Sequence, residues 1–251
     1  FDRRGRPVEG LTREDFKVLE DGVEQDVRRF EMVRDQPIYA GVVIDTSASM
    51  QEELNEAIQG ALRFFETVLT PKDRAAVVTF SDQPNLAVRF TNEQEILTGG
   101  LAGLRAEGET ALYDTLIYTL YYFGGLKGKR AVILLSDGAD TKSRYRFEDV
   151  LEYARRSGVA LYTVGLNLKS NETDIRIKLE RLAEETGGRS FFISDARALK
   201  GVYEKVESEL RSQYLLAYQS SNAGGEEKFR TVEVKMTQPG LEAKTMRGYY
   251  P

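Results

Sequence analysis

Continuously apolar segments alternate with amphipathic segments along the middle of the chain. The stretch Ile38–Ile44 is apolar throughout, which is typical of a strand buried on both faces of a sheet. Residues 51–69 place apolar side chains at helical spacing, which predicts an amphipathic helix. The same alternation predicts strands at 75–80, 87–90 (an edge strand), 130–135, 160–164 and 190–193, and helices at 93–103, 111–126, 147–157, 173–186 and 196–211.

The two ends of the chain carry strand patterns without helices between them. Residues 14–20 predict a strand, Asp21-Gly22 a hairpin turn, and residues 23–33 the returning strand. Residues 214–218, 229–236 and 241–249 predict three more strands, with an exposed loop at 220–227. Because the termini of a domain often lie close together, we expect the two ends to pair with each other.

These patterns predict one α/β fold with an appended module. Strands that alternate with helices form a mostly parallel sheet covered on both faces. We therefore expect a doubly wound, Rossmann-like domain over residues 37–212. A small antiparallel β module is expected from residues 1–36 and 213–251.

The composition narrows the possible chemistry. None of the 251 residues is cysteine, histidine or tryptophan, which excludes thiol nucleophiles, imidazole bases and the usual zinc sites. Hydrophobic residues make up 41% of the chain, enough for a packed core. The net charge of -5 argues against a nucleic-acid partner.

The sequence also bears on localisation. No stretch approaches the roughly 18 apolar residues that a membrane-spanning helix needs. The sequence shows no signal peptide and opens at Phe1 rather than at a methionine. We therefore expect the mature part of an exported protein, extracellular or periplasmic, whose leader is not included. No pattern indicates an oligomeric state.

Three predicted loops at one edge of the sheet carry hydroxyl and carboxylate groups. The first long strand ends at Asp45, with Ser47 and Ser49 just beyond it; Thr110 precedes one helix; Asp137 follows the strand at 130–135. Ligands of such sheets gather beyond the carboxyl ends of the strands, where the strand order reverses. A metal held there by oxygen alone would be a hard cation, namely Mg²⁺, Mn²⁺ or Ca²⁺.

The pattern Asp-x-Ser-x-Ser, with a later threonine and a later aspartate after an apolar strand, resembles the metal ion-dependent adhesion site of von Willebrand factor A domains. The resemblance covers about residues 38–211, and the terminal segments resemble a set of bacterial exported proteins related to that family. It implies that Ser47 and Ser49 bind the cation directly and that Thr110 does so in the high-affinity state. Asp45 and Asp137 would act mostly through water. One coordination position would remain for a carboxylate from a partner protein.

Each of these residues has a plainer interpretation as well. Taken singly, Asp45, Ser47 and Ser49 are good candidates for helix capping, and only the full five-residue pattern favours a metal site. Nearby acidic residues are expected to be structural or solvated: Asp114 in a first helical turn, Asp140 holding backbone amides, and Glu107 and Glu109 on an exposed loop.

We therefore expect a metal-dependent protein-interaction or adhesion module rather than an enzyme. One alternative is a scaffold or assembly subunit that recruits a catalytic partner. A Mg²⁺-dependent phosphohydrolase is a weaker alternative, because Ser47 stands where that chemistry needs a second aspartate. No Gly-Lys-Ser/Thr phosphate-binding loop is present either.

Overall fold

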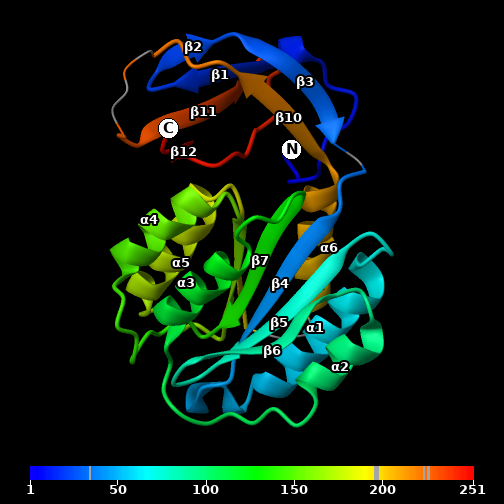
Figure 1. Cartoon of the computed structure of the whole chain (residues 1–251), viewed down its shortest axis with the longest axis vertical. Helices are drawn as coiled ribbons and strands as arrows, with labels where there is room; N and C mark the ends of the chain where they lie inside the picture. Colours follow the sequence, from blue (N-terminus) through cyan, green and yellow to red (C-terminus); the bar gives the residue numbers. More distant parts are fainter. Residues whose placement is uncertain (34, 195–197, 223, 225–226) are drawn as a thin grey trace.

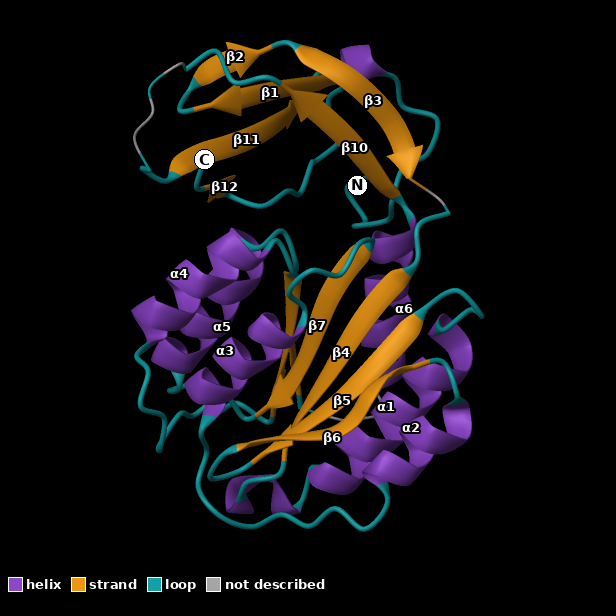
Figure 2. Ribbon diagram, in the orientation of Figure 1, coloured by secondary structure: helices purple, strands orange, loops and turns teal. Residues whose placement is uncertain are grey.

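The computed structural model describes residues 1–33, 35–194, 198–222, 224 and 227–251. A six-stranded sheet with helices on both faces forms one body (Figures 1 and 2). A second body lies beyond one end of this sheet and consists of antiparallel strands from both ends of the chain. The predicted fold class, a doubly wound, mostly parallel sheet with an antiparallel module, is confirmed.

The central sheet has the strand order β6-β5-β4-β7-β8-β9. All neighbouring strands are parallel except β6, which is antiparallel to β5; β6 lies at the edge of the sheet, as predicted. The chain order reverses between β4 and β7, so their carboxyl ends mark the switch point of the sheet. The strands span Ile38–Asp45 (β4), Arg74–Phe80 (β5), Pro84–Thr91 (β6), Lys129–Ser136 (β7), Ala160–Leu166 (β8) and Ser190–Ile193 (β9).

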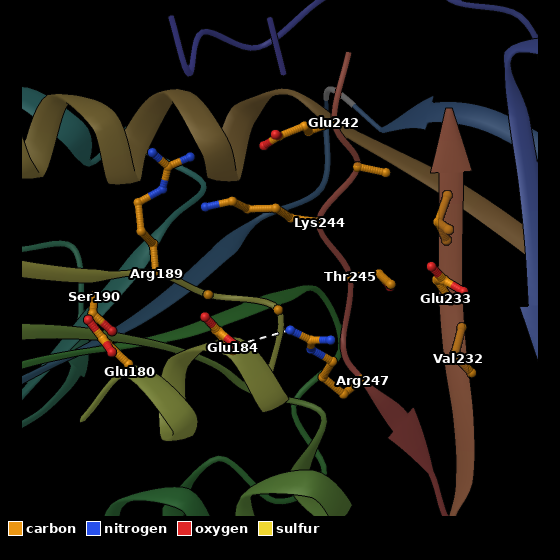
Figure 3. Close-up of a pocket in the computed structure, with 14 residues that line it drawn as sticks. Glu180, Glu184, Arg189, Ser190, Val232, Glu233, Glu242, Lys244, Thr245 and Arg247 are labelled. Carbon is orange, nitrogen blue, oxygen red and sulfur yellow. Dashed lines mark hydrogen bonds and ion pairs between the residues drawn. The ribbon is translucent and has the colours of Figure 1, made fainter. Parts of the chain in front are cut away.

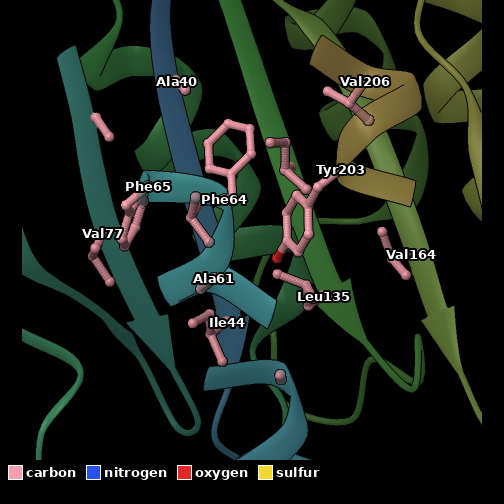
Figure 4. Packing of buried hydrophobic residues seen from close by; sticks show 14 of the residues in the cluster. Ala40, Ile44, Ala61, Phe64, Phe65, Val77, Leu135, Val164, Tyr203 and Val206 are labelled. Atoms are coloured by element: carbon pink, nitrogen blue, oxygen red, sulfur yellow. The ribbon is translucent and has the colours of Figure 1, made fainter. Parts of the chain in front are cut away.

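Three helices cover each face of this sheet. One face carries α1 (Leu54–Val68), α2 (Gln94–Leu101) and α6 (Leu199–Arg211), and the other carries α3 (Leu112–Tyr122), α4 (Phe147–Ser157) and α5 (Thr173–Glu185). In Figure 4, Phe64 and Phe65 of α1 and Tyr203 of α6 pack over the sheet on the first face. No helix in the described part of the chain is long and apolar enough to cross a membrane.

One predicted helix begins later than expected. A 3-10 turn, η2 (Ala48–Gln51), occupies the start of the helix predicted at 51–69, because the chain first has to leave the sheet edge. The helix predicted at 196–211 is described from Leu199, and residues 196 and 197 lie outside the described residues.

The two ends of the chain meet, as predicted. Strands β1 (Phe16–Glu20), β2 (Val23–Gln25), β11 (Arg230–Met236) and β12 (Gly248–Tyr249) form a sheet in the order β12-β11-β1-β2. Strands β3 (Val27–Val33) and β10 (Gln213–Tyr218) pair separately. The rings of Phe16, Phe30 and Tyr214 join these two sheets, with centroids 5.3 to 5.5 Å apart. We refer to these six strands as the β module.

Three predictions for these ends are wrong in detail. The strand expected at 14–20 begins with a 3-10 turn, η1 (Arg13–Asp15), in which Asp15 accepts a hydrogen bond from the Thr12 amide. The single strand expected at 23–33 is divided at Asp26 into two strands of different sheets. The strand expected at 241–249 pairs with β11 only at Gly248–Tyr249, because the Arg247 amide bonds to the Glu185 carbonyl of the helical body and the Glu242 main chain bonds to Phe1. Three residues of the predicted loop at 220–227, namely 223, 225 and 226, lie outside the described residues.

The chain passes between the two bodies twice, after β3 and after α6, and the buried side chain of Lys129 binds both segments. Lys129, at the start of β7, is 6% exposed, and its ammonium donates to the carbonyl of Val33 at 2.6 Å and to that of Leu210 at 2.7 Å. Burial, together with the positive charges of Arg211 and Lys72, lowers the pKa of Lys129 to about 8. The end of β3 and the end of α6 are thus held together where the β module joins the helical body.

Candidate metal site

The five candidate ligands lie on three connections at the end of the sheet remote from the β module. Asp45 is the last residue of β4, Asp137 directly follows β7, and Thr110 lies two residues before α3. The strand order places β4 and β7 side by side, so their carboxyl ends share the switch point. Both Asp45 and Thr110 are buried there: Asp45 is 0% and Thr110 4% exposed.

Asp45 is a buried carboxylate held by two donors. Its Oδ1 accepts the Ser47 amide at 2.9 Å, and its Oδ2 accepts the Ser136 hydroxyl at 2.6 Å. Burial raises the pKa of Asp45 to about 6, the hydrogen bonds oppose this rise, and the nearby charge of Asp137 adds to it. A positive charge at this position would favour the ionised form of Asp45.

The two serines turn their hydroxyls toward each other. Ser47 Oγ and Ser49 Oγ are 3.0 Å apart, with Ser47 buried and Ser49 exposed. Neither the turn η2 nor α1 has a side-chain hydrogen bond at its N-cap, so helix capping does not explain these hydroxyls. Two hydroxyl oxygens at this spacing, one buried and one open to solvent, suit a shared cation at the surface.

Backbone hydrogen bonds bring the three connections together. The Ala48 amide donates to the Gly108 carbonyl at 3.1 Å, and the Glu107 amide donates to the Thr46 carbonyl at 2.8 Å. The Thr110 carbonyl accepts the amides of Thr141 and Lys142 at 2.9 and 3.2 Å. Thr110 is therefore fixed between the loop after β4 and the loop after β7.

Asp137 supplies the observation that best tests whether these residues fit a cation. Its Oδ1 atom is buried and has no hydrogen-bond partner among the described residues. An unpaired buried carboxylate oxygen is costly, and a bound cation is one of the few ways to compensate it. No group of three or more carboxylates that could hold a metal occurs among the described residues, so a cation here needs the hydroxyls as well. The donor set of two carboxylates and three hydroxyls fits a hard divalent cation.

Sequence reasoning missed Ser136, the residue that positions Asp45. Its hydroxyl donates to Asp45 and accepts the Gly138 amide at 2.9 Å. Ser136 thereby links the end of β4 to the turn that carries Asp137. Its place beside Asp137 in the sequence is the only signal that could have identified it.

A second missed residue is Asp82, just after β5. Its Oδ1 accepts the Glu109 amide at 3.0 Å. Lys142 lies 2.6 Å from the Glu109 carboxylate and 3.4 Å from that of Asp82. These exposed contacts among Asp82, Glu109 and Lys142 stabilise the loop that carries Thr110.

The neighbouring acidic residues behave as expected. Asp114 lies in the first turn of α3, and its Oδ1 accepts the amides of Arg144 and Tyr145. Asp140 accepts the Tyr113 amide at 3.2 Å and the Ser143 hydroxyl at 2.6 Å. Glu107 and Glu109 are exposed. These side chains order the surrounding loops.

Gly138 offers a direct test of how tightly the turn after Asp137 is packed. Its φ is +82°, and a Cβ there would lie 2.4 Å from Ile175 Cγ2. Gly138→Ala is expected to lower the free energy of unfolding by about 2 kcal/mol, from backbone strain plus overpacking. Gly103→Ala is the matched control, because its φ is +73° and nothing lies within 4 Å of its Cβ position. Equal losses in urea unfolding would contradict tight packing at Gly138.

Comparisons with known proteins show the family and the fold of this chain. The model of the von Willebrand factor type A domain matches residues 41–205. A solved structure of the vWF domain of the type V pili tip protein Mfa5 from Porphyromonas gingivalis is similar, with TM-score 0.60 and 15% identity, over 70% of this chain and 95% of that one. A D319A mutant of the PilB minor pilin from Streptococcus sanguinis gives TM-score 0.59 and 13% identity over 70% of this chain. The match spans 62% of the PilB chain. The pilus adhesin SpaC from Lactobacillus rhamnosus GG, in its open conformation, gives TM-score 0.62 and 13% identity over 82% of this chain and 35% of that one. At these identities the structures share the fold.

Proposed function

Because the chain belongs to the von Willebrand factor type A domain family, we propose that it is a metal-dependent protein-interaction module of the adhesion type and not an enzyme. The observation that carries this proposal is the buried, unpartnered Oδ1 of Asp137 beside the buried carboxylate of Asp45. The chemistry of the donor set favours Mg²⁺, with Mn²⁺ or Ca²⁺ as substitutes.

In this proposal Ser47, Ser49 and Thr110 supply hydroxyl oxygens, while Asp45 and Asp137 supply the negative charge. The cation would supply Lewis acidity and an exchangeable coordination position. Ser136 would hold Asp45 in place through its 2.6 Å hydrogen bond. Removing a residue that orients a metal ligand through a hydrogen bond commonly lowers the affinity for the metal by 10- to 100-fold.

The partner in this proposal is a protein that offers an exposed carboxylate to the cation. Two carboxylates and three neutral hydroxyls carry no excess negative charge over a divalent ion, so an additional anionic ligand is favourable. The similar structures include a pili tip protein and a pilus adhesin, which supports an adhesive role and an exported location. A single desolvated contact of this kind could act as the hot spot of the interface.

The first test is whether Mg²⁺ stabilises the folded chain through these residues. Ligand at 100 times its Kd adds about 2.7 kcal/mol to the free energy of unfolding. We expect MgCl₂ to raise the Tm of the wild type and to leave that of Asp45→Asn unchanged. Because burial raises the pKa of Asp45, removing its charge should cost the metal-free chain little beyond the one hydrogen bond that an amide nitrogen cannot accept. The measurement is differential scanning calorimetry in EDTA and in a Mg²⁺ titration.

Two further variants distinguish direct coordination of Mg²⁺ from a general effect of the negative charge near the site. Thr110→Val removes one hydroxyl while keeping the volume, and should weaken Mg²⁺ binding without unfolding the chain. Glu107→Gln removes an exposed charge from the same loop and should retain the wild-type Mg²⁺ response. A wild type with no Mg²⁺, Mn²⁺ or Ca²⁺ response would refute the metal site. Turnover of a phosphate ester with Mg²⁺ that is lost in Asp45→Asn would refute the non-enzymatic assignment.

A further inference from the structure

A cavity of about 470 Å³ lies between the helical body and the β module. One wall is β11, at Val232, Glu233 and Val234; another is the extended segment 241–247, which we call the C-terminal arm. The end of α5 and the residues leading into β9 close the remaining side. In Figure 3 the arm runs beside β11, with Arg189, Ser190 and Glu180 on its other side. The volume and the position between two bodies are those of a ligand site.

The β11 wall of this cavity is an open sheet edge. Thr231 accepts the Asp21 amide and Thr237 donates to the Asp15 carbonyl, so the odd-numbered residues of β11 bond to β1. The even-numbered residues therefore face the other side. Of these, Val232 donates to the Arg247 carbonyl at 2.9 Å. For Val234 and Met236 no backbone partner occurs on that side among the described residues.

The hydrogen bonds between β11 and the C-terminal arm stop at Val232, because the main chain of the arm at Met246 and Arg247 bonds to the helical body instead. In a continued hairpin the Arg247 amide would bond to the Val232 carbonyl, but it donates to the Glu185 carbonyl at 3.2 Å instead. An isolated antiparallel bridge then joins Met246 to Thr186. The exposed pair Arg247–Glu184, 3.0 Å apart, adds to this attachment. Beyond Val232 the arm thus makes no main-chain hydrogen bond to the edge of β11 among the described residues.

The charges around the cavity favour a basic occupant. Carboxylates outnumber cations along the walls: Glu180, Glu184, Glu233 and Glu242 against Arg189, Lys244 and Arg247. Arg189 is already paired with Glu209 at 2.7 Å, and Arg247 with Glu184. The carboxylates of Glu180 and Glu242 form no ion pair or hydrogen bond with another side chain among the described residues. The Phe1 ammonium and Lys244 lie near Glu242, so Glu180 is the carboxylate that an occupant with positive side chains would find available.

We propose that this cavity binds an extended peptide with basic side chains, which pairs as an added strand with the open edge of β11 at Val234 and Met236. Main-chain hydrogen bonds to the edge would provide affinity in such a complex, and side-chain contacts would provide selectivity. This site is separate from the metal site, which lies at the opposite end of the central sheet.

The probe is a capped hexapeptide of alternating valine and lysine, with the same composition rearranged around two prolines as the non-strand control. Fluorescence polarisation of the labelled hexapeptide measures its Kd against the whole chain in EDTA. We expect the alternating peptide to bind and the proline peptide to bind at least tenfold more weakly. An alternating valine–glutamate peptide should also bind at least tenfold more weakly.

Amide hydrogen exchange locates the peptide on the strand. In the free chain the amides of Val234 and Met236 should exchange rapidly, while those of Glu233 and Lys235, which face β1, should be protected. The valine–lysine peptide should protect Val234 and Met236. Protection of both amides before peptide is added would overturn the proposal, because the edge would already be covered.

Two sets of variants complete the test. Val234→Pro removes the amide that faces the cavity and should weaken peptide binding at least tenfold, whereas Val234→Thr keeps the amide and should bind as the wild type. The chain has no cysteine, so Thr186→Cys with Met246→Cys can lock the arm in its observed position by a disulfide. Binding should persist in the locked form. Equal binding by Val234→Pro and Val234→Thr, or loss of binding in the locked form that dithiothreitol restores, would overturn the proposal.

Discussion

Replacing Glu20 by alanine is expected to lower the free energy of unfolding of the β module by about 3–5 kcal/mol, because it leaves a buried guanidinium without its counter-ion. Glu20 is 2% exposed and Arg230 is 7% exposed. The Glu20 carboxylate accepts hydrogen bonds from Tyr218 at 2.8 Å, Ser220 at 2.5 Å, Tyr249 at 2.9 Å and Arg230 at 3.2 Å. One side chain of β1 thus ties together β10, β11, β12 and the loop after β10.

Urea unfolding followed by hydrogen exchange would measure this effect. Amides of β11 should lose protection in Glu20→Ala, while those of β7 in the helical body should change less. Burial acts to raise the pKa of Glu20, but the hydrogen bonds outweigh it and hold that pKa below its ordinary value. The contribution of Glu20 should therefore be present above about pH 4.5 and be lost as the pH falls further.

Glu24→Ala is the matched control for Glu20→Ala. Glu24 lies on the neighbouring strand β2, its side chain is 64% exposed, and its pair with Lys17 is 3.9 Å long. Such surface pairs contribute little, so no measurable change in stability is expected. Similar losses in the two variants would contradict the stabilising role of the buried Glu20 cluster.

The central sheet was predictable because the apolar pattern that identifies each strand lies within the strand itself. Ile38–Ile44 and the run at 130–135 are apolar at every position, a pattern that a strand buried on both faces requires. The structure places both at the centre of the sheet, with β4 and β7 adjacent. The helix predicted at 147–157 has those bounds in the structure and ends at Gly158, whose φ is +62°.

The pairing of the terminal strands was less predictable because it depends on contacts with other parts of the fold. Alternation over residues 241–249 is genuine, and side-chain exposure alternates along 241–246 as in a strand. What decides the outcome is the Arg247 amide, which bonds to α5 instead of β11. No local pattern reveals that competition. The division of 23–33 at Asp26 is similar, because its two halves belong to different sheets.

At the candidate metal site, residue types and their spacing predicted which loops meet, but not which neighbouring residues enclose and orient the candidate ligands. The local pattern around Asp45 does not reveal that the hydroxyl of Ser136 and the turn at Ser47 enclose its carboxylate. That burial has a consequence for the proposed function. A carboxylate that is already buried and held by two donors would lose less entropy and solvation when a cation binds, so the proposed site would be preorganised.

Replacing Asp73 by asparagine is expected to lower the free energy of unfolding by about 2.5 kcal/mol at pH 7 and by much less at pH 2–3. Asp73 is 0% exposed, and its Oδ2 accepts from Arg211 at 2.6 Å, while its Oδ1 accepts the Ile38 amide at 2.9 Å. Burial acts to raise the pKa of Asp73, but the hydrogen bonds from Arg211 and Thr70 outweigh it and lower the pKa to about 2. A shift of nearly two pKa units corresponds to about 2.5 kcal/mol.

The pH dependence distinguishes this ion pair from simple packing. Because the folded-state pKa of Asp73 is depressed, its stabilisation is complete above the ordinary value near 4 and disappears as the pH falls toward 2. Urea midpoints of wild type and Asp73→Asn should therefore converge between pH 5 and pH 2. Asp174→Asn, which removes an exposed pair with Lys178, should match the wild type at every pH. If the gap between wild type and Asp73→Asn stayed constant down to pH 2, the link from α6 through Arg211 to the start of β4 would not depend on the charge of Asp73.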